Sequence, residues 1–278
     1  MNKLELMKMA NEVRKDALTG VFHAKAGHPG GSLSAADIFT YLLFEEMNID
    51  PENPKKADRD RFVLSKGHTA PGYYAALAHR GFFPVEDMKT LRKIGSYLQG
   101  HPDMKNIPGV DMSSGSLGQG ISAAVGMAIA GKLKNEDFRV YTVLGDGEIQ
   151  EGQVWEAAML AGHRNLDNLV VIVDNNNLQI DGTIEEVNSP YPIDKKFEAF
   201  KFHVINIDGH DFEQIAAAFA EAKATKGQPT AIIAKTVKGK GVSFMENQVG
   251  WHGKAPNDEE FAIAMEDLRK AGEALCQK

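Results

Sequence analysis

Hydrophobic residues follow two spacings along the chain, and these spacings predict strands that alternate with helices. Short apolar runs predict strands, and apolar residues three or four positions apart predict helices. The predicted strands span residues 61–64, 138–144, 169–173, 204–207 and 230–235. The predicted helices span residues 4–24, 34–47, a stretch from Pro71, then 117–133, 151–163, 212–226 and 258–275.

This alternation predicts an α/β fold, a single parallel-sheet sandwich with helices on both faces. We expect one domain over residues 1–278, because no repeat, low-complexity tract or linker interrupts the chain. The glycine-rich stretch 27–31 is predicted to be a break between the first two helices. Residues 237–256 carry no predicted element, and a long loop of this kind, with Trp251 and His252 between glycines, favours a functional role.

Two polar residues follow neighbouring predicted strands. Asp146 lies in Gly145-Asp146-Gly147, and Asn176 follows the next strand, 176 − 146 = 30 residues later. A strand–helix–strand unit of this length is a right-handed crossover between parallel strands, so both residues are predicted at the carboxyl edge of the sheet, where open α/β sheets bind ligands. Carboxylate and amide oxygens suit Mg²⁺ or Ca²⁺ rather than zinc.

The same pair predicts a divalent ion that carries a diphosphate, because Mg²⁺ fills most of its octahedron with phosphate oxygens and water. The main-chain carbonyl of Leu178 is placed to be a third protein ligand. Gly147 allows close approach of the backbone, and the helix predicted from about residue 151 points its N-terminus at this edge, which favours an anion. Glu151 is either a favourable charge at that helix start or a buried acid near an interface.

Four histidines share one pattern. His28, His68, His101 and His252 each lie beside a glycine in a predicted loop, where catalytic groups concentrate. Histidine can donate to phosphate or hydroxyl groups and can move protons near neutral pH. A zinc site is a weaker alternative, because none of their spacings matches a short metal-ligand pair.

The turn Gly115-Ser116-Leu117-Gly118-Gln119-Gly120 opens a helix rich in small residues. It is not a dinucleotide fingerprint, since its glycines fall in another order and no strand immediately precedes it, and the chain has no P-loop motif. Two interpretations stay open for this turn, a ligand held by the main chain and simple helix packing.

Composition and charge narrow the possible partners. The net charge is −7 and the acidic residues are scattered, so no basic face suggests nucleic acid or a membrane surface. Cys276 is the only cysteine, which excludes an intramolecular disulfide. No apolar run approaches the ~18 residues of a membrane span. We expect a soluble protein of the cytoplasm.

Taken together, the motifs resemble the transketolase family, specifically its N-terminal, thiamine diphosphate-binding domain. The resemblance covers about residues 20–256 and rests on Gly27-His28-Pro29-Gly30-Gly31, residues 59–68, Gly100-His101-Pro102, residues 115–120, Gly145-Asp146-Gly147, Asn176 and Trp251-His252-Gly253. It implies the thiamine diphosphate-binding fold and the transfer of a two-carbon ketol unit from a ketose phosphate to an aldose phosphate.

The resemblance also implies the cofactor site, thiamine diphosphate with Mg²⁺ or Ca²⁺. It implies that the ion is held by Asp146, Asn176 and the Leu178 carbonyl, and that the diphosphate is contacted by Gly147 and His68. The other implied contacts are those of Gly115, Ser116 and Leu117 with the aminopyrimidine, Ile180 with the ring system, and His28, His101 and His252 with the substrate, His252 also lying near the diphosphate.

Two departures from the family pattern matter. Ser116 stands where the family usually has proline, but the implied contact there is main-chain. Full-length members continue into a pyrimidine-binding domain and a C-terminal domain, and this further portion supplies an activating glutamate and the arginines for sugar phosphate. We therefore expect a separate subunit that carries this C-terminal part, in an α₂β₂ assembly, with the helix at 117–133 and the long loop as candidate contact surfaces.

Other interpretations remain. The chain could belong to another two-component ketol transferase that acts on a modified sugar, such as a sulfonated one. The α chain of a 2-oxo acid dehydrogenase shares the fold and the metal motif but is expected to lack the four histidines. A non-catalytic, regulatory binder of thiamine diphosphate is an alternative of a different class, against which the full set of histidines and metal ligands argues.

Overall fold

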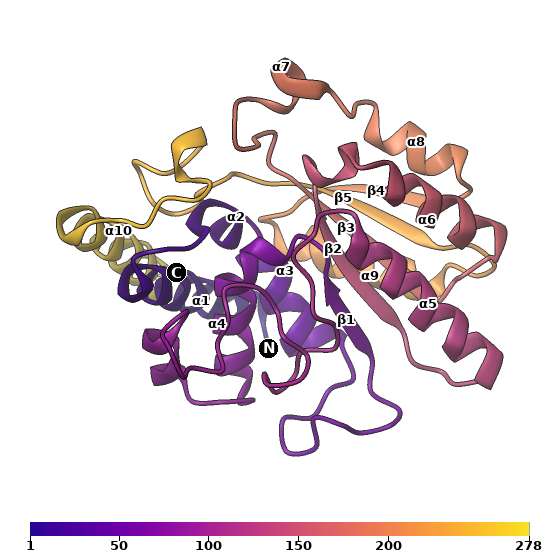
Figure 1. Cartoon of the computed structure of the whole chain (residues 1–278), viewed down its shortest axis with the longest axis horizontal. Coiled ribbons are helices and arrows are strands. Elements are labelled where there is room, and N and C mark those ends of the chain that lie inside the picture. The colour runs from indigo at the N-terminus through magenta and orange to yellow at the C-terminus, as the bar shows by residue number, and fades with distance from the viewer. Residues whose placement is uncertain (278) are drawn as a thin grey trace.

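Five parallel strands form one sheet within residues 1–277, the part of the chain that the computed structural model describes (Figure 1). The order across the sheet is β1-β2-β3-β5-β4. The predicted α/β fold with a parallel sheet is confirmed, and Lys278, the last residue of the predicted single domain, lies outside the described residues. The strands are β1 (Arg61–Leu64), β2 (Val140–Gly145), β3 (Leu169–Asn175), β4 (His203–Asp208) and β5 (Thr230–Lys235).

Helices cover both faces of the sheet. One face packs against α1, α3, α4 and α9, and the other against α5, α6 and α8. The helices are α1 (Lys3–Ala24), α2 (Pro29–Ser34), α3 (Ala36–Tyr41), α4 (Ala70–Arg80), α5 (Gln119–Lys134), α6 (Gly152–His163), α7 (Ile184–Asn188), α8 (Ile193–Ala199), α9 (Phe212–Ala224) and α10 (Asp258–Cys276).

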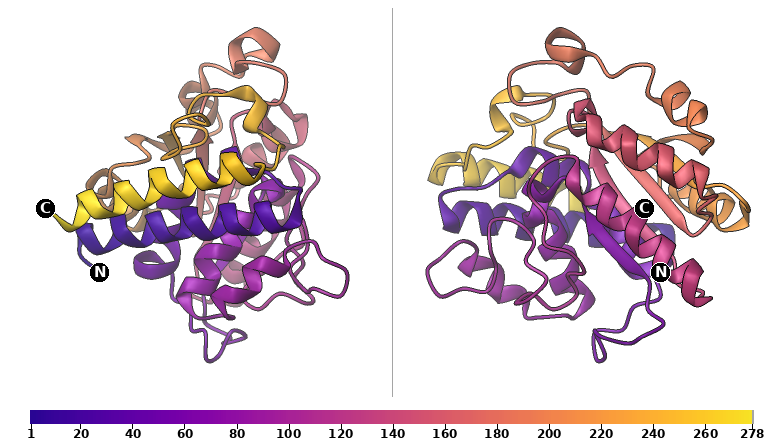
Figure 2. Two further views of the ribbon diagram at one scale, coloured as in Figure 1. Left: turned by 90° about the vertical axis from the view of Figure 1, so that its left-hand side faces the viewer. Right: turned by 45° about the vertical axis from the view of Figure 1, so that its right-hand side comes forward.

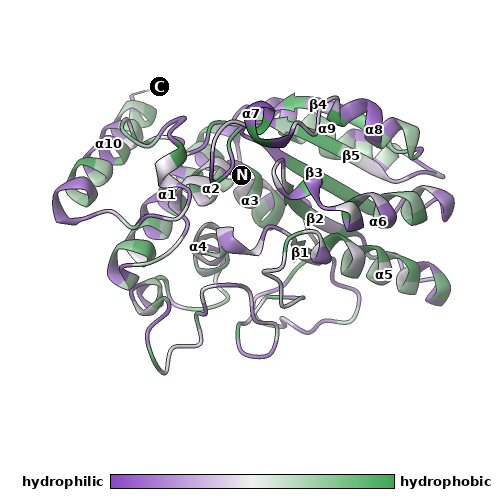
Figure 3. Ribbon diagram, turned by 45° about the horizontal axis from the view of Figure 1, so that its top comes forward, coloured by the Kyte–Doolittle hydropathy of each residue, from purple (hydrophilic) through white to green (hydrophobic). Residues whose placement is uncertain are grey.

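Successive residues of the central strands point to opposite faces and divide the core in two. In β3, Val170 and Ile172 join the cluster beneath α1, α3, α4 and α9, whereas Val171 and Val173 join the cluster beneath α5, α6 and α8. The hydropathy colouring shows β3 as largely apolar (Figure 3), and its polar residues Asp174 and Asn175 stand at the end of the strand. Strands buried on both faces have this continuous apolar character, which explains why the sequence reads as apolar runs and not as alternation.

The first and last helices lie side by side (Figure 2). The amide of Asn11 in α1 donates to the carbonyl of Leu268 in α10 at 2.9 Å. A smaller apolar cluster, which includes Leu18, Trp251 and Leu268, joins this helix pair to the stretch 237–256. The C-terminal helix α10 therefore packs against residues 237–256, which have little regular structure of their own.

The predicted helix at 34–47 is wrong in its extent. Helical structure begins at Pro29, within the stretch predicted as a break, because proline is well suited to the first helical position. It then bends at Ala35, continues as α3 and ends in a π-helical turn at Leu42–Glu46.

The connection between β3 and β4 is more ordered than the sequence indicated. It contains α7 and α8, neither of which was predicted. Thr183 caps α7 through a reciprocal pair of hydrogen bonds with Glu186, and Phe197 of α8 is buried against the sheet. Both helices are too short for a periodic apolar pattern to stand out. Across the part of the chain described here, no helix is long and apolar enough to span a membrane.

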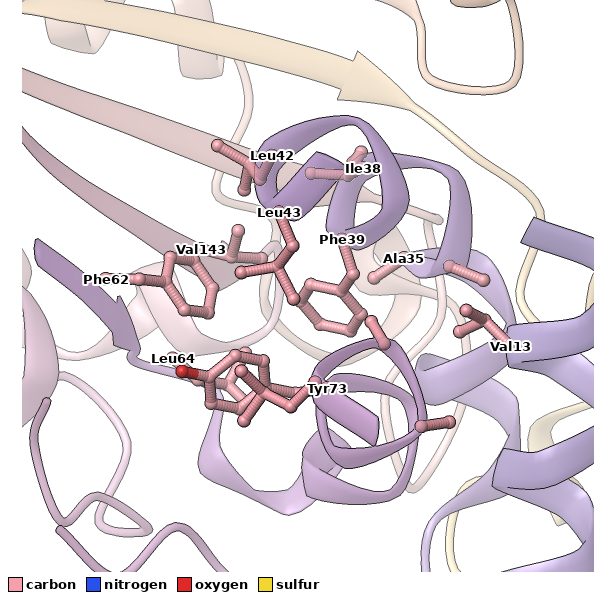
Figure 4. Packing of buried hydrophobic residues seen from close by; sticks show 14 of the residues in the cluster. Val13, Ala35, Ile38, Phe39, Leu42, Leu43, Phe62, Leu64, Tyr73 and Val143 are labelled. Atoms are coloured by element: carbon pink, nitrogen blue, oxygen red, sulfur yellow. The ribbon is translucent and has the colours of Figure 1, made fainter. Parts of the chain in front are cut away.

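Phe39 is a fully buried residue of the core. Its ring centroid lies 6.2 Å from that of Phe62 and 6.1 Å from that of Tyr73 (Figure 4). Phe39→Ala leaves a cavity beneath β1, so we expect the free energy of unfolding in urea to fall by about 3–5 kcal/mol. Ile94→Ala is the matched control, because Ile94 is fully exposed and its truncation should change stability by less than about 0.5 kcal/mol. Equal losses in both variants would contradict this account of the core.

Candidate active site

A cavity of about 230 Å³ opens at the carboxyl edge of the sheet, where β1, β2 and β3 end. The β2–β3 register pairs Gly145 with Asp174, so the residues that follow each strand emerge side by side. The residues that line the cavity are Gly31, Lys66, His68, Leu117, Gly145, Asp146, Gly147, Glu148, Asn176, Leu178, Gln179, Ile180, Lys238 and His252. Of the predicted site residues, His28, His101, Gly115 and Ser116 lie outside this lining.

The three predicted metal ligands lie together. Asp146 is buried and accepts hydrogen bonds from the main-chain N–H groups of Gly147 and Asn177. The Asn176 side-chain oxygen accepts from the Leu178 N–H at 3.1 Å. Burial and the nearby Asp174 carboxylate raise the pKa of Asp146 to about 7, and a bound divalent cation would favour its ionised form.

Lys238 reaches into this group, and the sequence analysis did not single it out. Its ammonium donates to the Leu178 carbonyl at 3.1 Å and lies 3.0 Å from Nδ1 of His252. Burial lowers the pKa of Lys238 to about 8, although the Asp146 carboxylate opposes that shift. A positive group thus already contacts one of the oxygens predicted to hold a cation. The Lys-Gly-Lys-Gly run at 238–241 was the available signal in the sequence.

The lining fits a diphosphate and a divalent ion. Glycine at 31, 145 and 147 brings main chain directly to the cavity wall, and a Cβ atom on Gly147 would lie 3.2 Å from Gln179. Within the described residues, the Gln179 Nε2 atom is buried without a hydrogen-bond partner, and so is Nδ1 of His28. Buried polar atoms of this kind call for a ligand or water. The oxygen donors suit a hard cation, and the two lysines suit the anion that carries it.

The four predicted histidines converge beside the cavity from four separate loops. The ring centroid of His28 lies 5.2 Å from that of His68, 5.4 Å from that of His252 and 6.2 Å from that of His101. His68 and His252 are 5.1 Å apart. In the part of the chain that the structure describes, no group of three or more His, Cys, Asp or Glu side chains has the geometry of a metal site, so the zinc alternative finds no support.

All four histidines are neutral at neutral pH. Burial lowers the pKa of His28 to about 4 and that of His252 to about 3, and nearby positive charges add to both shifts. Burial also lowers the pKa of His68 and of His101. Each ring therefore offers one donor and one acceptor nitrogen and carries no positive charge.

Arg92 is a second residue that the sequence analysis missed. It has a left-handed backbone conformation, with φ of 60°, and its guanidinium packs against Gly100, where a Cβ atom would lie 2.4 Å from one of its nitrogens. After burial, the positive charge of Arg92 is the next cause of the lowered pKa values of His28 and His101. The positive charge of Arg92 thus acts on two of the four histidines.

The turn at 115–118 borders the histidines and the start of α6. A Cβ atom on Gly115 would lie 3.2 Å from the His101 ring, and one on Gly118, where φ is 81°, would lie 2.8 Å from the Glu151 Cβ. Both positions therefore require glycine. Glu151 is exposed and precedes α6, so the interpretation as a buried acid does not hold for this chain by itself.

A buried ionic network supports the cavity floor. The Asp174 carboxylate accepts from the Lys66 ammonium, the Ser34 hydroxyl at 2.6 Å, the Thr236 hydroxyl and the Asn176 amide at 3.2 Å. Burial by itself would raise the pKa of Asp174, but the Lys66 charge and these donors hold it below its usual value. Asp174 thereby joins the segments after β1 and β5 to α2.

Nearly the whole chain is similar in sequence to proteins that are already known. Residues 6–271 match the thiamine diphosphate binding domain of transketolase. The chain is 46% identical to the 6-deoxy-6-sulfo-D-fructose transketolase subunit SqwG of Clostridium sp. (strain MSTE9), over 97% of this chain and 98% of that protein. It is 42% identical to one of the subunits of apulose-4-phosphate transketolase from Phocaeicola vulgatus, over 98% of this chain and 96% of that protein.

Single-chain transketolases match over a smaller share of their length. Mouse transketolase is 46% identical over 91% of this chain but only 40% of its own. The crystal structure of Campylobacter jejuni transketolase superposes with a TM-score of 0.90 at 34% identity, and covers 99% of this chain and 46% of that one. In fold and site the chain is thus a thiamine diphosphate-binding α/β protein. It belongs to the transketolase family.

The lowered histidine pKa values predict a pH dependence of stability. The folded pKa of His28, about 4, lies below the ~6.5 of an unfolded histidine. The unfolded chain therefore binds more protons between about pH 6.5 and 4, and His28 costs stability as the pH falls through that window. Relative to His28→Asn, we expect the wild type to lose on the order of 1 kcal/mol in urea unfolding between pH 7 and 5, after allowance for partial exposure. A difference that does not change with pH would contradict neutral burial.

Proposed function

We propose that the chain is the thiamine diphosphate-binding subunit of a two-component transketolase. It transfers a two-carbon ketol unit from a ketose to an aldose, with a divalent metal, Mg²⁺ or Ca²⁺, beside the diphosphate. The observation that carries the proposal is the single cavity that gathers Asp146, Asn176 and the Leu178 carbonyl next to His68 and His252. Family membership supports the cofactor, and the oxygen donors support the metal.

Under this proposal, the residues of this chain have separate roles in the site. Asp146, Asn176 and the Leu178 carbonyl hold the ion, and Gly147, His68, His252 and Lys238 contact the diphosphate. The main chain at Gly115, Ser116 and Leu117 meets the aminopyrimidine, and Ile180 packs on the ring system. When bound, thiamine diphosphate supplies the carbon nucleophile for breaking and forming the carbon–carbon bond.

His28, His101 and His252 would handle the substrate. Because burial keeps their pKa values low, these rings are neutral and can both donate hydrogen bonds to the sugar and accept them from it. The His28 Nδ1 atom, which has no partner in the described residues, is available for a hydroxyl group. A neutral imidazole can take a proton from a hydroxyl group in one step and return it in the next.

The comparisons favour a modified sugar as the ketose donor. Relatives that match along nearly their whole length are named as transketolase subunits for 6-deoxy-6-sulfo-D-fructose and for apulose 4-phosphate. Single-chain transketolases are equally similar in sequence but extend well beyond the matched region. We therefore place 6-deoxy-6-sulfofructose or apulose 4-phosphate ahead of an ordinary ketose phosphate for this chain.

A separate subunit with the pyrimidine-binding domain would complete the site, in an α₂β₂ assembly. The subunit names of the relatives and the 40–46% coverage of single-chain transketolases support this partner. Candidate contact surfaces are the outer sides of α5 and α6, which expose Leu133 and Met159, and the cavity rim at Leu117 and Ile180. Large apolar side chains that gather on a surface are typical of an interface.

The metal proposal is tested at Asp146. Asp146→Asn keeps the size of the side chain but removes its charge, so we expect more than about tenfold weaker binding of thiamine diphosphate with Mg²⁺, measured by calorimetry on the assembled enzyme. Asp181→Asn is the control, an exposed aspartate on the neighbouring loop after β3 that should leave the affinity unchanged. Undiminished affinity in the Asp146 variant, with an unchanged urea midpoint, would show that the ion is held elsewhere.

The reaction is tested by mixing the purified chain with a candidate pyrimidine-domain subunit encoded beside it. We expect ketol transfer to glyceraldehyde 3-phosphate only in the mixture, with 6-deoxy-6-sulfofructose, apulose 4-phosphate and xylulose 5-phosphate compared as donors. Activity from the chain alone would refute the two-component arrangement. Cofactor binding by the mixture without turnover of any donor would instead favour the alternative of a regulatory thiamine diphosphate binder.

A further inference from the structure

A largely buried histidine outside the cavity, His210, joins the N-terminal helices to the segment that carries Lys238. It lies in the turn between β4 and α9. Its Nε2 atom accepts a hydrogen bond from the main-chain N–H of Val237 at 2.9 Å, and its Nδ1 atom lies 2.7 Å from the Asp37 carboxylate. Because Nε2 is an acceptor, the ring proton of neutral His210 must sit on Nδ1, from which it donates to Asp37.

Asp37 is itself fixed from the other side. This buried residue of α3 accepts from both terminal nitrogens of Arg14 in α1, and the Arg14 Nε atom donates to the Leu33 carbonyl at 3.2 Å. Burial would raise the pKa of Asp37, but the Arg14 charge and His210 hold it below its usual value. The carboxylate is therefore a permanent acceptor, and it orients the imidazole so that Nε2 faces Val237.

The contact with Val237 belongs to a series of main-chain anchors around Lys238. The Thr236 N–H donates to the Asn175 carbonyl at 3.1 Å, and the Gly239 N–H donates to the Gly30 carbonyl at 2.9 Å. Val237, which lies between them, uses a side chain as its acceptor, and that side chain is His210. His210 thus holds the peptide immediately before Lys238.

Lys238 tolerates little displacement. Its side chain is almost fully buried, and the ammonium reaches the Leu178 carbonyl and His252 at 3.1 and 3.0 Å. Because the side chain is packed on all sides, a shift of the backbone would change the position of the ammonium relative to both contacts. Because Lys238 lies in the cavity wall, its position decides how the wall meets an anion there.

We propose that His210, oriented by Asp37 and Arg14, is a positioning residue that sets Lys238 for the diphosphate of the cofactor. The proposal rests on the proposed function, since it assigns the diphosphate to this cavity. His210 itself touches no reacting atom. Its effect passes through one main-chain hydrogen bond. From the β4–α9 turn, the His210 ring contacts two other segments, α3 through Asp37 and the segment after β5 through Val237.

Two isosteric variants separate this role from general packing. In His210→Gln the side-chain oxygen reaches the Nε2 position and can still accept from Val237. In His210→Asn the amide reaches only the Nδ1 position, so it keeps the bond to Asp37 and loses the one to Val237. His203→Asn is the control, because His203 lies in neighbouring β4 and its ring pairs with Glu221 near the surface, away from Val237.

The experiment measures amide hydrogen exchange at residues 236–239 in the chain, and calorimetric affinity for thiamine diphosphate with Mg²⁺ in the assembled enzyme. We expect His210→Asn to speed exchange at Val237 and to weaken cofactor binding by about three- to tenfold, the range for loss of one hydrogen bond. His210→Gln should recover most of both, while the urea midpoints of the two variants stay within error of each other.

The outcomes are distinguishable. If wild type binds the cofactor and His210→Asn binds it equally well, the positioning role is wrong and the proposed function stands. Equal weakening in the Asn and Gln variants would also overturn it, since that pattern means His210 only supports packing. If the wild-type assembly binds no thiamine diphosphate, the proposed function fails first and the positioning role fails with it.

Discussion

One buried carboxylate, that of Asp174, holds together the segments from which the site is built. Its partners come from the end of β1, from α2, from the end of β5 and from the turn after its own strand. A charge with no solvent contact is costly unless it is paired and its remaining lone pairs are used, and here the Lys66 ammonium and three further donors do both. Removing one partner would leave the others buried without compensation. The cavity floor is therefore defined electrostatically as much as by packing.

The parallel sheet could be predicted from the sequence because its strands are buried on both faces and read as uninterrupted apolar runs. The same reasoning placed the ends of β2 and β3 side by side, since a crossover of 30 residues leaves few other topologies. It failed where local signals were short or in conflict. Proline within a glycine-rich stretch started α2 early, and α7 and α8 lack enough turns to show a periodic pattern.

Only part of the candidate site could be predicted from the sequence. Residues with a distinctive local context could be found: Asp146 between two glycines, Asn176 after a strand, and histidines beside glycine. Lys66, Lys238 and Arg92 could not, because lysine and arginine are common surface residues and only the fold shows that the two lysines are buried. The contacts of His210 with Asp37 and Val237 join positions 173 and 27 residues apart. No local pattern reports such contacts.

The rim of the cavity is apolar, whereas its floor is charged. Leu117 is 37% exposed and Ile180 is 64% exposed, and both lie above the charged groups that line the interior. The two layers respond to the solvent in opposite ways. Added sulfate or phosphate salts strengthen the covering of an apolar rim but screen the attraction between lysines and an anion below it. Covering the apolar rim and binding an anion in the interior thus depend on ionic strength in opposite directions.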